Sequence, residues 1–171
     1  MDAAATFTEI DNTLADFIQT LSLFTDEQIN KIPFDGCWTP GQVAQHVILS
    51  ISGFVDLLYG PVADTDRPAD KYVGNLKETF LNFNIKFQSP VAVIPPAIDY
   101  KKEKLLHTLD QQKNNLHKFD LTTDMTKTCA AVEIPVFGFL TRTEVAHFII
   151  YHTQRHVHQL KQIYQKLNHI K

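Results

Sequence analysis

Hydrophobic side chains recur at alternating steps of three and four residues near the start of the chain. This spacing places them along one stripe of an α-helix, as is typical of a helix that packs against a core. The positions are Phe7, Ile10, Leu14, Phe17, Leu21 and Phe24. Thr6 followed by Glu9 has the spacing of a capping box, which predicts that a helix over residues 7–24 begins there. Residues 26–31 are expected to form one further short turn.

A second helix is predicted to begin at Thr39 and to end before Gly60. Thr39 suits the N-cap, Pro40 suits the first helical position, and Gln42 completes a capping box. The apolar periodicity that follows places His46 on the inward face of this helix.

The most regular pattern lies near the C-terminal end of the sequence. Thr141 and Glu144 form another capping-box pair. Inward positions then follow at steps of three and four: Val145, Ile149, His152, His156, Leu160, Ile163 and Leu167. The pattern predicts a long helix that ends near Asn168, with histidines at two positions where aliphatic residues are usual.

The middle of the chain predicts one more long helix, over residues 99–118, and two irregular connections, 60–98 and 119–140. Residues 76–83 are expected to add one or two helical turns. Four long helices with two long connections predict an all-α fold, a four-helix bundle with long crossover connections. The length suits one domain over residues 1–171.

The composition excludes several classes of protein. Hydrophobic residues make up 44% and charged residues 20%, as in globular proteins. A net charge of −3 excludes a nucleic-acid binder that works by bulk positive charge, and two cysteines exclude a disulfide scaffold. The uncharged stretch 36–55 is too rich in Pro, Gly, Gln and Ser to span a membrane. Residues 1–6 lack the features of a secretory signal, so we expect a cytoplasmic protein.

The two histidines of the last helix predict a metal site. His152 and His156 are four residues apart, so their imidazoles lie one turn apart on one face and can meet one ion. Burying both rings costs free energy unless each ring nitrogen has a partner, which a shared cation supplies. The alternative to a metal site is that each histidine is a core residue whose ring nitrogens form hydrogen bonds. His46 is the predicted third ligand.

The donor set bears on the metal and on its role. Three imidazole nitrogens suit Zn(II), Ni(II), Fe(II) and Mn(II), and the sequence does not choose among them. Three protein ligands also leave at least one coordination position open, which is typical of catalytic sites.

Several neighbouring residues have more than one interpretation. His147, His158 and His169 lie off the face of the pair, so we expect them at the surface or at an interface. Trp38 is predicted to anchor the core, with a place at the mouth of the site as the alternative. Cys37 is expected to be an inert thiol, because nothing in the sequence activates it as a nucleophile.

Two residues of the last helix lie close to the histidine pair. Arg155 is expected to form a surface salt bridge, and the alternative is that it orients an anionic substrate. Gln159 is predicted to hydrogen-bond a metal ligand from behind.

The motifs around these histidines resemble those of a known family. Trp38-Thr39-Pro40, followed five residues later by His46, is similar to the W-S/T-P-x5-H element of the DinB/YfiT-like superfamily of metalloenzymes. His152, His156, Gln159 and Leu160 resemble its H-x3-H-x2-Q-I/L helix, and residues 135–141 resemble the lead-in before that helix. The resemblance implies a four-helix bundle, often dimeric, with a divalent metal ion held by His46, His152 and His156. It also implies thiol-dependent chemistry, because some members are transferases or isomerases that use small thiols.

Two functions follow from these observations. The first is a divalent-metal-dependent enzyme that acts on a small molecule as a thiol-dependent transferase or a hydrolase, with a low-molecular-weight thiol as partner and a homodimer as the assembly. The second is a non-catalytic, metal-stabilised bundle that acts as a binding module. An open coordination position favours the first function, and a closed four-ligand site would favour the second.

Overall fold

The structure is a computed structural model that describes residues 2–168. Its helices and strands are, in chain order, α1 (Ala3–Ser22), α2 (Asp26–Ile29), α3 (Pro40–Tyr59), β1 (Val62–Ala63), α4 (Val73–Leu81), the 3-10 turn η1 (Val91–Val93), α5 (Lys102–His117), β2 (Thr128–Cys129) and α6 (Arg142–Asn168).

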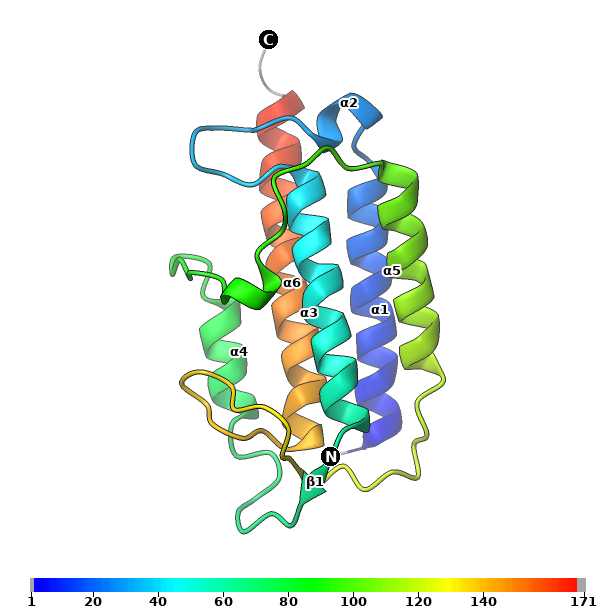
Figure 1. The fold of residues 1–171 in the computed structure, drawn as a ribbon, viewed down its shortest axis with the longest axis vertical. Coiled ribbons are helices and arrows are strands. Elements are labelled where there is room, and N and C mark those ends of the chain that lie inside the picture. Colours follow the sequence, from blue (N-terminus) through cyan, green and yellow to red (C-terminus); the bar gives the residue numbers. More distant parts are fainter. Residues whose placement is uncertain (1, 169–171) are drawn as a thin grey trace.

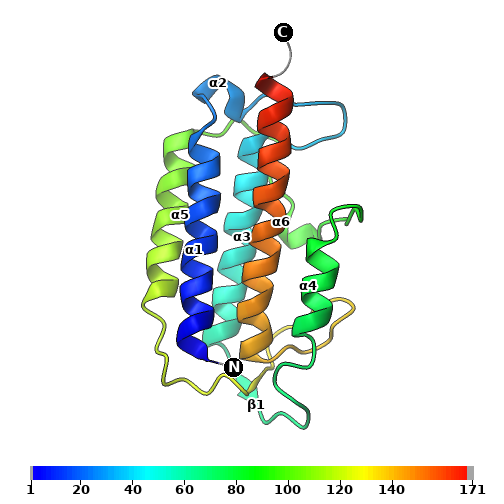
Figure 2. The same cartoon turned by 180° about the vertical axis from the view of Figure 1, so that it is seen from behind.

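Four long helices form the bundle that the sequence predicts (Figure 1). Helices α1 and α3 both pack against α5 and α6, so the four lie at the corners of one core. The same arrangement is seen from behind in Figure 2, where α4 lies outside the bundle against α6. Completely buried side chains such as Leu14, Val47 and Leu160 fill the centre. The predicted all-α four-helix bundle with crossover connections is therefore correct.

The predicted start of the first helix is wrong. Helix α1 begins at Ala3, and the carboxylate of Asp2 caps it by accepting a hydrogen bond from the Ala4 amide at 3.0 Å. Thr6 lies inside the helix and its hydroxyl donates to the Asp2 carbonyl. Three consecutive alanines favour helix strongly, so the helix extends to the aspartate before them.

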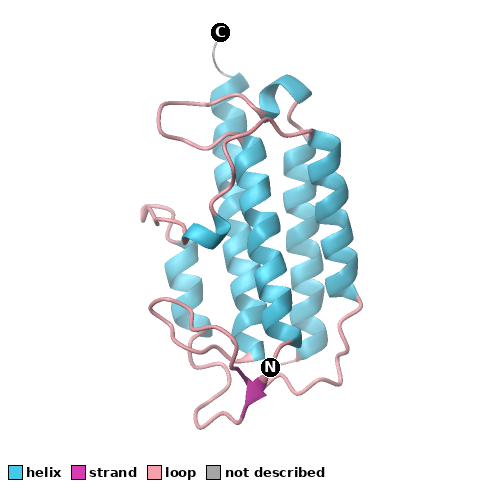
Figure 3. Ribbon diagram, viewed as in Figure 1, coloured by secondary structure: helices cyan, strands magenta, loops and turns pink. Residues whose placement is uncertain are grey.

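The predicted boundaries of α3 and α6 are correct, and those of the middle elements differ. Both reciprocal bonds of the Thr39–Gln42 capping box are present. The turns expected over residues 76–83 are the regular helix α4, which ends before Phe83. Most of the two connections lacks regular structure, as Figure 3 shows.

The two connections are fastened together at one end of the bundle. Strands β1 and β2 pair antiparallel, with Val62 opposite Cys129. Beside them the carboxylate of Glu144, fully buried at the start of α6, accepts hydrogen bonds from both Nη atoms of Arg67 at 2.7 Å. Glu144 also accepts from the amides of Tyr72 and Thr141. One buried carboxylate therefore caps α6 and holds the crossover from α3 to α4 against it. No helix in the described part of the chain is long and apolar enough to cross a membrane.

Candidate metal centre

Three histidines from two helices meet inside the bundle. Nε2 of His152 lies 3.1 Å from Nε2 of His46 on α3, and 3.2 Å from Nε2 of His156 on α6. All three residues are buried, with 3–8% of their surface exposed. They meet because α3 and α6 are neighbours and all three residues lie on the faces that pack together. The structure thus brings together the three residues that the sequence singles out, and they could hold a metal ion.

Hydrogen bonds on the far side fix the protonation of two of the rings. Nδ1 of His46 lies 2.8 Å from the carbonyl oxygen of Val93, and Nδ1 of His156 lies 2.8 Å from the amide oxygen of Gln159. Both oxygens can only accept, so each Nδ1 carries the proton. Each Nε2 therefore presents a lone pair toward the centre, which is the tautomer that a metal ligand needs.

The third ring, His152, decides whether the centre suits a cation. Its Nδ1 is buried and has no hydrogen-bond partner among residues 2–168, while its Nε2 faces the lone pairs of the other two rings. A tetrahedral ion bound at about 2.05 Å holds its nitrogens roughly 3.3 Å apart. The observed 3.1 and 3.2 Å fit that spacing. The donor set and its geometry therefore fit a divalent ion.

Burial keeps the three imidazoles neutral. Desolvation lowers the pKa of His46 below the ordinary value of 6.5, against an opposing effect of the hydrogen bond to Val93. Desolvation, followed by the neighbouring histidines and Arg155, lowers the pKa of His152 well below that value. The pKa of His156 is lowered to about 3, mainly by burial. Neutral rings are the form that binds metal, so little proton competition is expected near neutral pH.

Aromatic rings surround the centre. Phe54, Phe80 and Phe148 lie with their ring centroids 5.8–6.0 Å from that of His152. Trp38 packs against the core, as predicted, and its ring lies 5.0 Å from that of His46, so it also forms part of the wall. An apolar wall of this kind strengthens electrostatic interactions within the site.

The two predictions for residues beside the pair have different outcomes. Gln159 does hydrogen-bond His156 from behind, as predicted. The salt bridge expected for Arg155 is absent from the ion pairs of residues 2–168. Its guanidinium instead donates to the carbonyls of Phe80, Asn82 and Ile85. These carbonyls belong to the last turn of α4 and to the segment that follows it, so the sequence pattern does not indicate them.

The prediction for His147 is wrong. It is buried rather than at the surface, and its Nδ1 donates to the Thr143 carbonyl at 2.8 Å. Residues 145–150 are all buried, so α6 is enclosed on every side there and a single apolar stripe does not describe it. His158 is partly exposed and stacks on Phe83, and His169 lies outside the described residues.

Cys37 lies close to the wall but not in the centre. It is half-buried beside Trp38, and burial raises the pKa of its thiol. The group of residues close enough to share an ion contains His46, His152 and His156 and no cysteine. These observations favour the inert thiol over the nucleophile.

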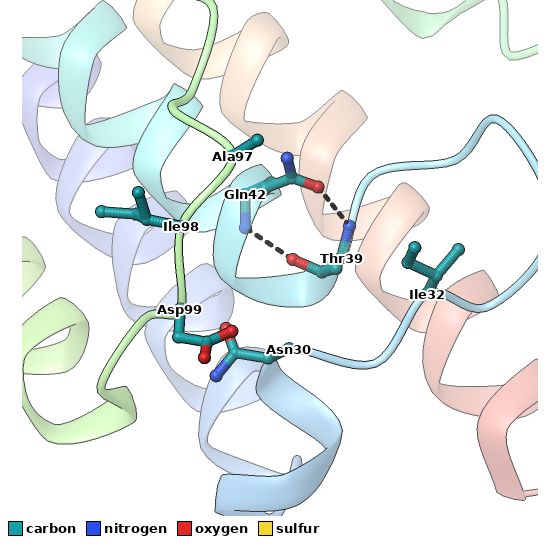
Figure 4. A pocket seen from close by; sticks show the side chains of 7 residues that line it. All are labelled: Asn30, Ile32, Thr39, Gln42, Ala97, Ile98 and Asp99. Carbon is teal, nitrogen blue, oxygen red and sulfur yellow. Dashed lines mark hydrogen bonds between the residues drawn. The ribbon is translucent and has the colours of Figure 1, made fainter.

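A separate pocket of about 400 Å³ lies at the N-terminal end of α3 (Figure 4). Its lining is Asn30, Ile32, Thr39, Gln42, Ala97, Ile98 and Asp99, and it contains none of the three histidines. The capping pair Thr39–Gln42 forms one side of it. The lining comes from three separate segments, so no local sequence pattern indicates the pocket.

One comparison with known proteins places the chain in a family. A family model described as the DinB superfamily matches residues 9–160, a range that includes all three histidines. No curated protein and no solved structure matched the chain. The family match agrees with the resemblance of the two histidine motifs and with the helical bundle, and this chain therefore belongs to the DinB superfamily.

Proposed function

We propose that His46, His152 and His156 bind one divalent metal ion and that the protein is a metal-dependent enzyme acting on a small molecule. The observation that carries the proposal is the meeting of three Nε2 atoms, two of which are fixed as lone-pair donors by Val93 and Gln159. Zn(II), Ni(II), Fe(II) and Mn(II) all suit three imidazole nitrogens.

The proposal gives a role to the residues in and around the three-histidine centre. The three histidines bind the ion, Val93 and Gln159 orient two of them, and the phenylalanines exclude water. A bound divalent ion supplies Lewis acidity, which lowers the pKa of a thiol or a water molecule in its coordination shell. Three protein ligands leave room for that small molecule.

The reaction class depends on which small molecule binds the ion beside the three histidines. The family resemblance favours a low-molecular-weight thiol and hence a thiol-dependent transferase, whereas a bound water would make the protein a hydrolase. We expect a cytoplasmic protein, and the family resemblance favours a homodimer. Sedimentation velocity on untagged protein tests the dimer.

A second candidate is a non-catalytic bundle in which the metal only stabilises the fold. The near-complete burial of the three rings is the observation that favours it, because a substrate needs access to the ion. Binding of a small thiol or an inhibitor to the metal-loaded protein would support the enzyme, and a fourth protein ligand would support the structural site.

The test is the metal content of protein purified without a polyhistidine tag or a nickel column. We expect about one divalent ion per chain in the wild type and little in His152→Ala. His158→Ala alters a histidine of the same helix outside the centre and should keep the ion. Equal metal content in the wild type and His152→Ala, with both folded by circular dichroism, would contradict the proposal.

A further inference from the structure

The segment between α4 and α5, residues 82–101, crosses the bundle beside the metal centre, and we name it the strap. In Figure 1 it runs from the end of α4, through η1 and along α3, to the start of α5. Its only helical turn, η1, contacts α3. The strap supplies the Val93 carbonyl that holds Nδ1 of His46, so its position bears directly on one predicted ligand.

Arg155 fastens the strap at its α4 end. One guanidinium nitrogen donates to the carbonyls of Phe80 and Asn82 at 3.1 and 3.0 Å, and the other donates to the carbonyl of Ile85. The last carbonyls of a helix lack intrahelical partners and carry partial negative charge, so a cation is stabilised there. The guanidinium also lies 4.8 Å from the ring centre of Phe87.

The described part of the chain provides no charged partner for Arg155. No ion pair among residues 2–168 includes its guanidinium, which is partly buried. A partly desolvated guanidinium whose described hydrogen-bond partners are all backbone carbonyls is well suited to fix the path of a segment whose regular backbone bonds are limited to the single turn η1.

The other end of the strap is fastened separately. The side chain of Asn30 accepts a hydrogen bond from the Tyr100 amide at 2.8 Å and donates to the Tyr100 carbonyl at 3.0 Å. Between the two ends, the bond from His46 to Val93 is the contact with the metal centre. The segment that carries the Val93 carbonyl is therefore fastened at both of its ends.

We propose that Arg155 is a positioning residue for the metal centre, acting through the strap and the Val93 carbonyl on the orientation of His46. The inference rests on the proposed metal site. Loss of the Arg155 contacts frees the start of the strap, weakens the His46–Val93 bond and lets the His46 ring turn away from the centre. Metal then dissociates faster, although Arg155 is not a ligand.

The first experiment measures zinc release into excess coloured chelator by stopped-flow absorbance. We expect Arg155→Ala to release zinc about tenfold faster than wild type or more, the size of effect seen when residues that orient metal ligands are lost. Arg155→Lys keeps one charged donor and should fall between them. Lys161→Ala, which removes another cation of α6 that pairs with the exposed Asp16, is the matched control and should not differ from wild type.

The second experiment separates this inference from the proposed metal site and from general loosening of the fold. In nitrogen-15 spectra of the metal-free protein, Arg155→Ala should lose the protected Nδ1 proton of His46 and keep that of His156, which Gln159 holds. Unchanged protection of His46 together with unchanged zinc release would overturn the inference. A wild type that binds no zinc, together with selective loss of the His46 proton in Arg155→Ala, would overturn the metal site alone.

Discussion

The amide oxygen of Gln159 lies 2.8 Å from Nδ1 of His156, one turn along the same helix. This bond decides which nitrogen of His156 carries the proton, because an amide oxygen can only accept a hydrogen bond and Nδ1 must donate it. Both residues lie on α6 and belong to the H-x3-H-x2-Q motif. Their separation of three residues along the helix is what brings them into contact.

Loss of this bond should weaken metal binding without removing a ligand. We expect Gln159→Leu to lower the affinity for Zn(II) by about 10–100-fold, the range found when a hydrogen bond behind a metal ligand is lost. Competition with a chelator of known affinity measures it. Gln154→Leu, on the same helix and with no described contact to the centre, should bind as wild type. Equal affinities for the two variants would show that Gln159 does not orient the ligand.

The stability of the metal-free protein should depend on pH through the three histidines. Burial lowers the pKa of each in the folded state, for His156 to about 3, whereas the unfolded chain protonates them near 6.5. Below about pH 6.5 the unfolded state therefore binds more protons, and the free energy of unfolding falls as the pH falls. Urea unfolding at pH 7.5, 6 and 5 should show this fall.

The contribution of His156 to this slope can be isolated. Each such group contributes up to about 1.4 kcal/mol per pH unit within its window, here from about 6.5 down to about 3. His156→Leu removes one group, so its slope should be smaller by up to that amount. The same slope in wild type and His156→Leu would mean that His156 is not held neutral by the fold.

The sequence predicts the helices whose buried positions recur periodically. It does not predict helix boundaries that depend on a single side chain or on contacts with a distant helix. The stripe of α6 and its capping pair locate that helix, because each turn repeats the same burial. The start of α1 depends on one carboxylate at Asp2, and the length of α4 depends on contacts with α6. Neither leaves a period in the sequence, so both are missed.

The same distinction applies to the site. His46, His152 and His156 are found from the sequence because each occupies an apolar position on a regular helix. The Val93 carbonyl is missed, because a backbone group in an irregular segment has no residue-type signature. Arg155 is misassigned for the same reason, since its partners are backbone carbonyls about seventy residues away.

The buried pair Glu144–Arg67 should contribute strongly to stability. Glu144 is fully buried and binds Arg67 through two bonds of 2.7 Å, so Glu144→Gln leaves a partly buried guanidinium without its counter-charge. We expect a loss of about 3 kcal/mol in the free energy of unfolding by urea. The double variant with Arg67→Met should recover part of it, because both charges are then absent.

An exposed ion pair provides the control for this prediction. Lys161 and Asp16 lie 3.2 Å apart with about half of each side chain exposed, so Asp16→Asn should leave the urea midpoint unchanged within error. A Glu144→Gln protein as stable as Asp16→Asn would show that the buried carboxylate does not hold the connection to α6.

Binding of a small thiol at the metal centre is the prediction that bears most directly on function. The centre offers three nitrogen ligands and no sulfur, because Cys37 and Cys129 lie outside the group. In protein loaded with Co(II), a low-molecular-weight thiol that binds the ion adds a sulfur-to-metal charge-transfer band in the near ultraviolet. We expect this band to grow with thiol concentration and to be absent from His156→Ala, which lacks a ligand.

The source of the sulfur is settled by one further variant. Cys37 precedes Trp38, whose ring forms part of the wall, and burial raises the pKa of the Cys37 thiol, so we expect Cys37→Ser to keep the band. Loss of the band in Cys37→Ser would assign the sulfur to the protein and favour a closed, structural site. A panel of cellular thiols that leaves the cobalt spectrum unchanged would instead favour a hydrolase, in which water takes the open position.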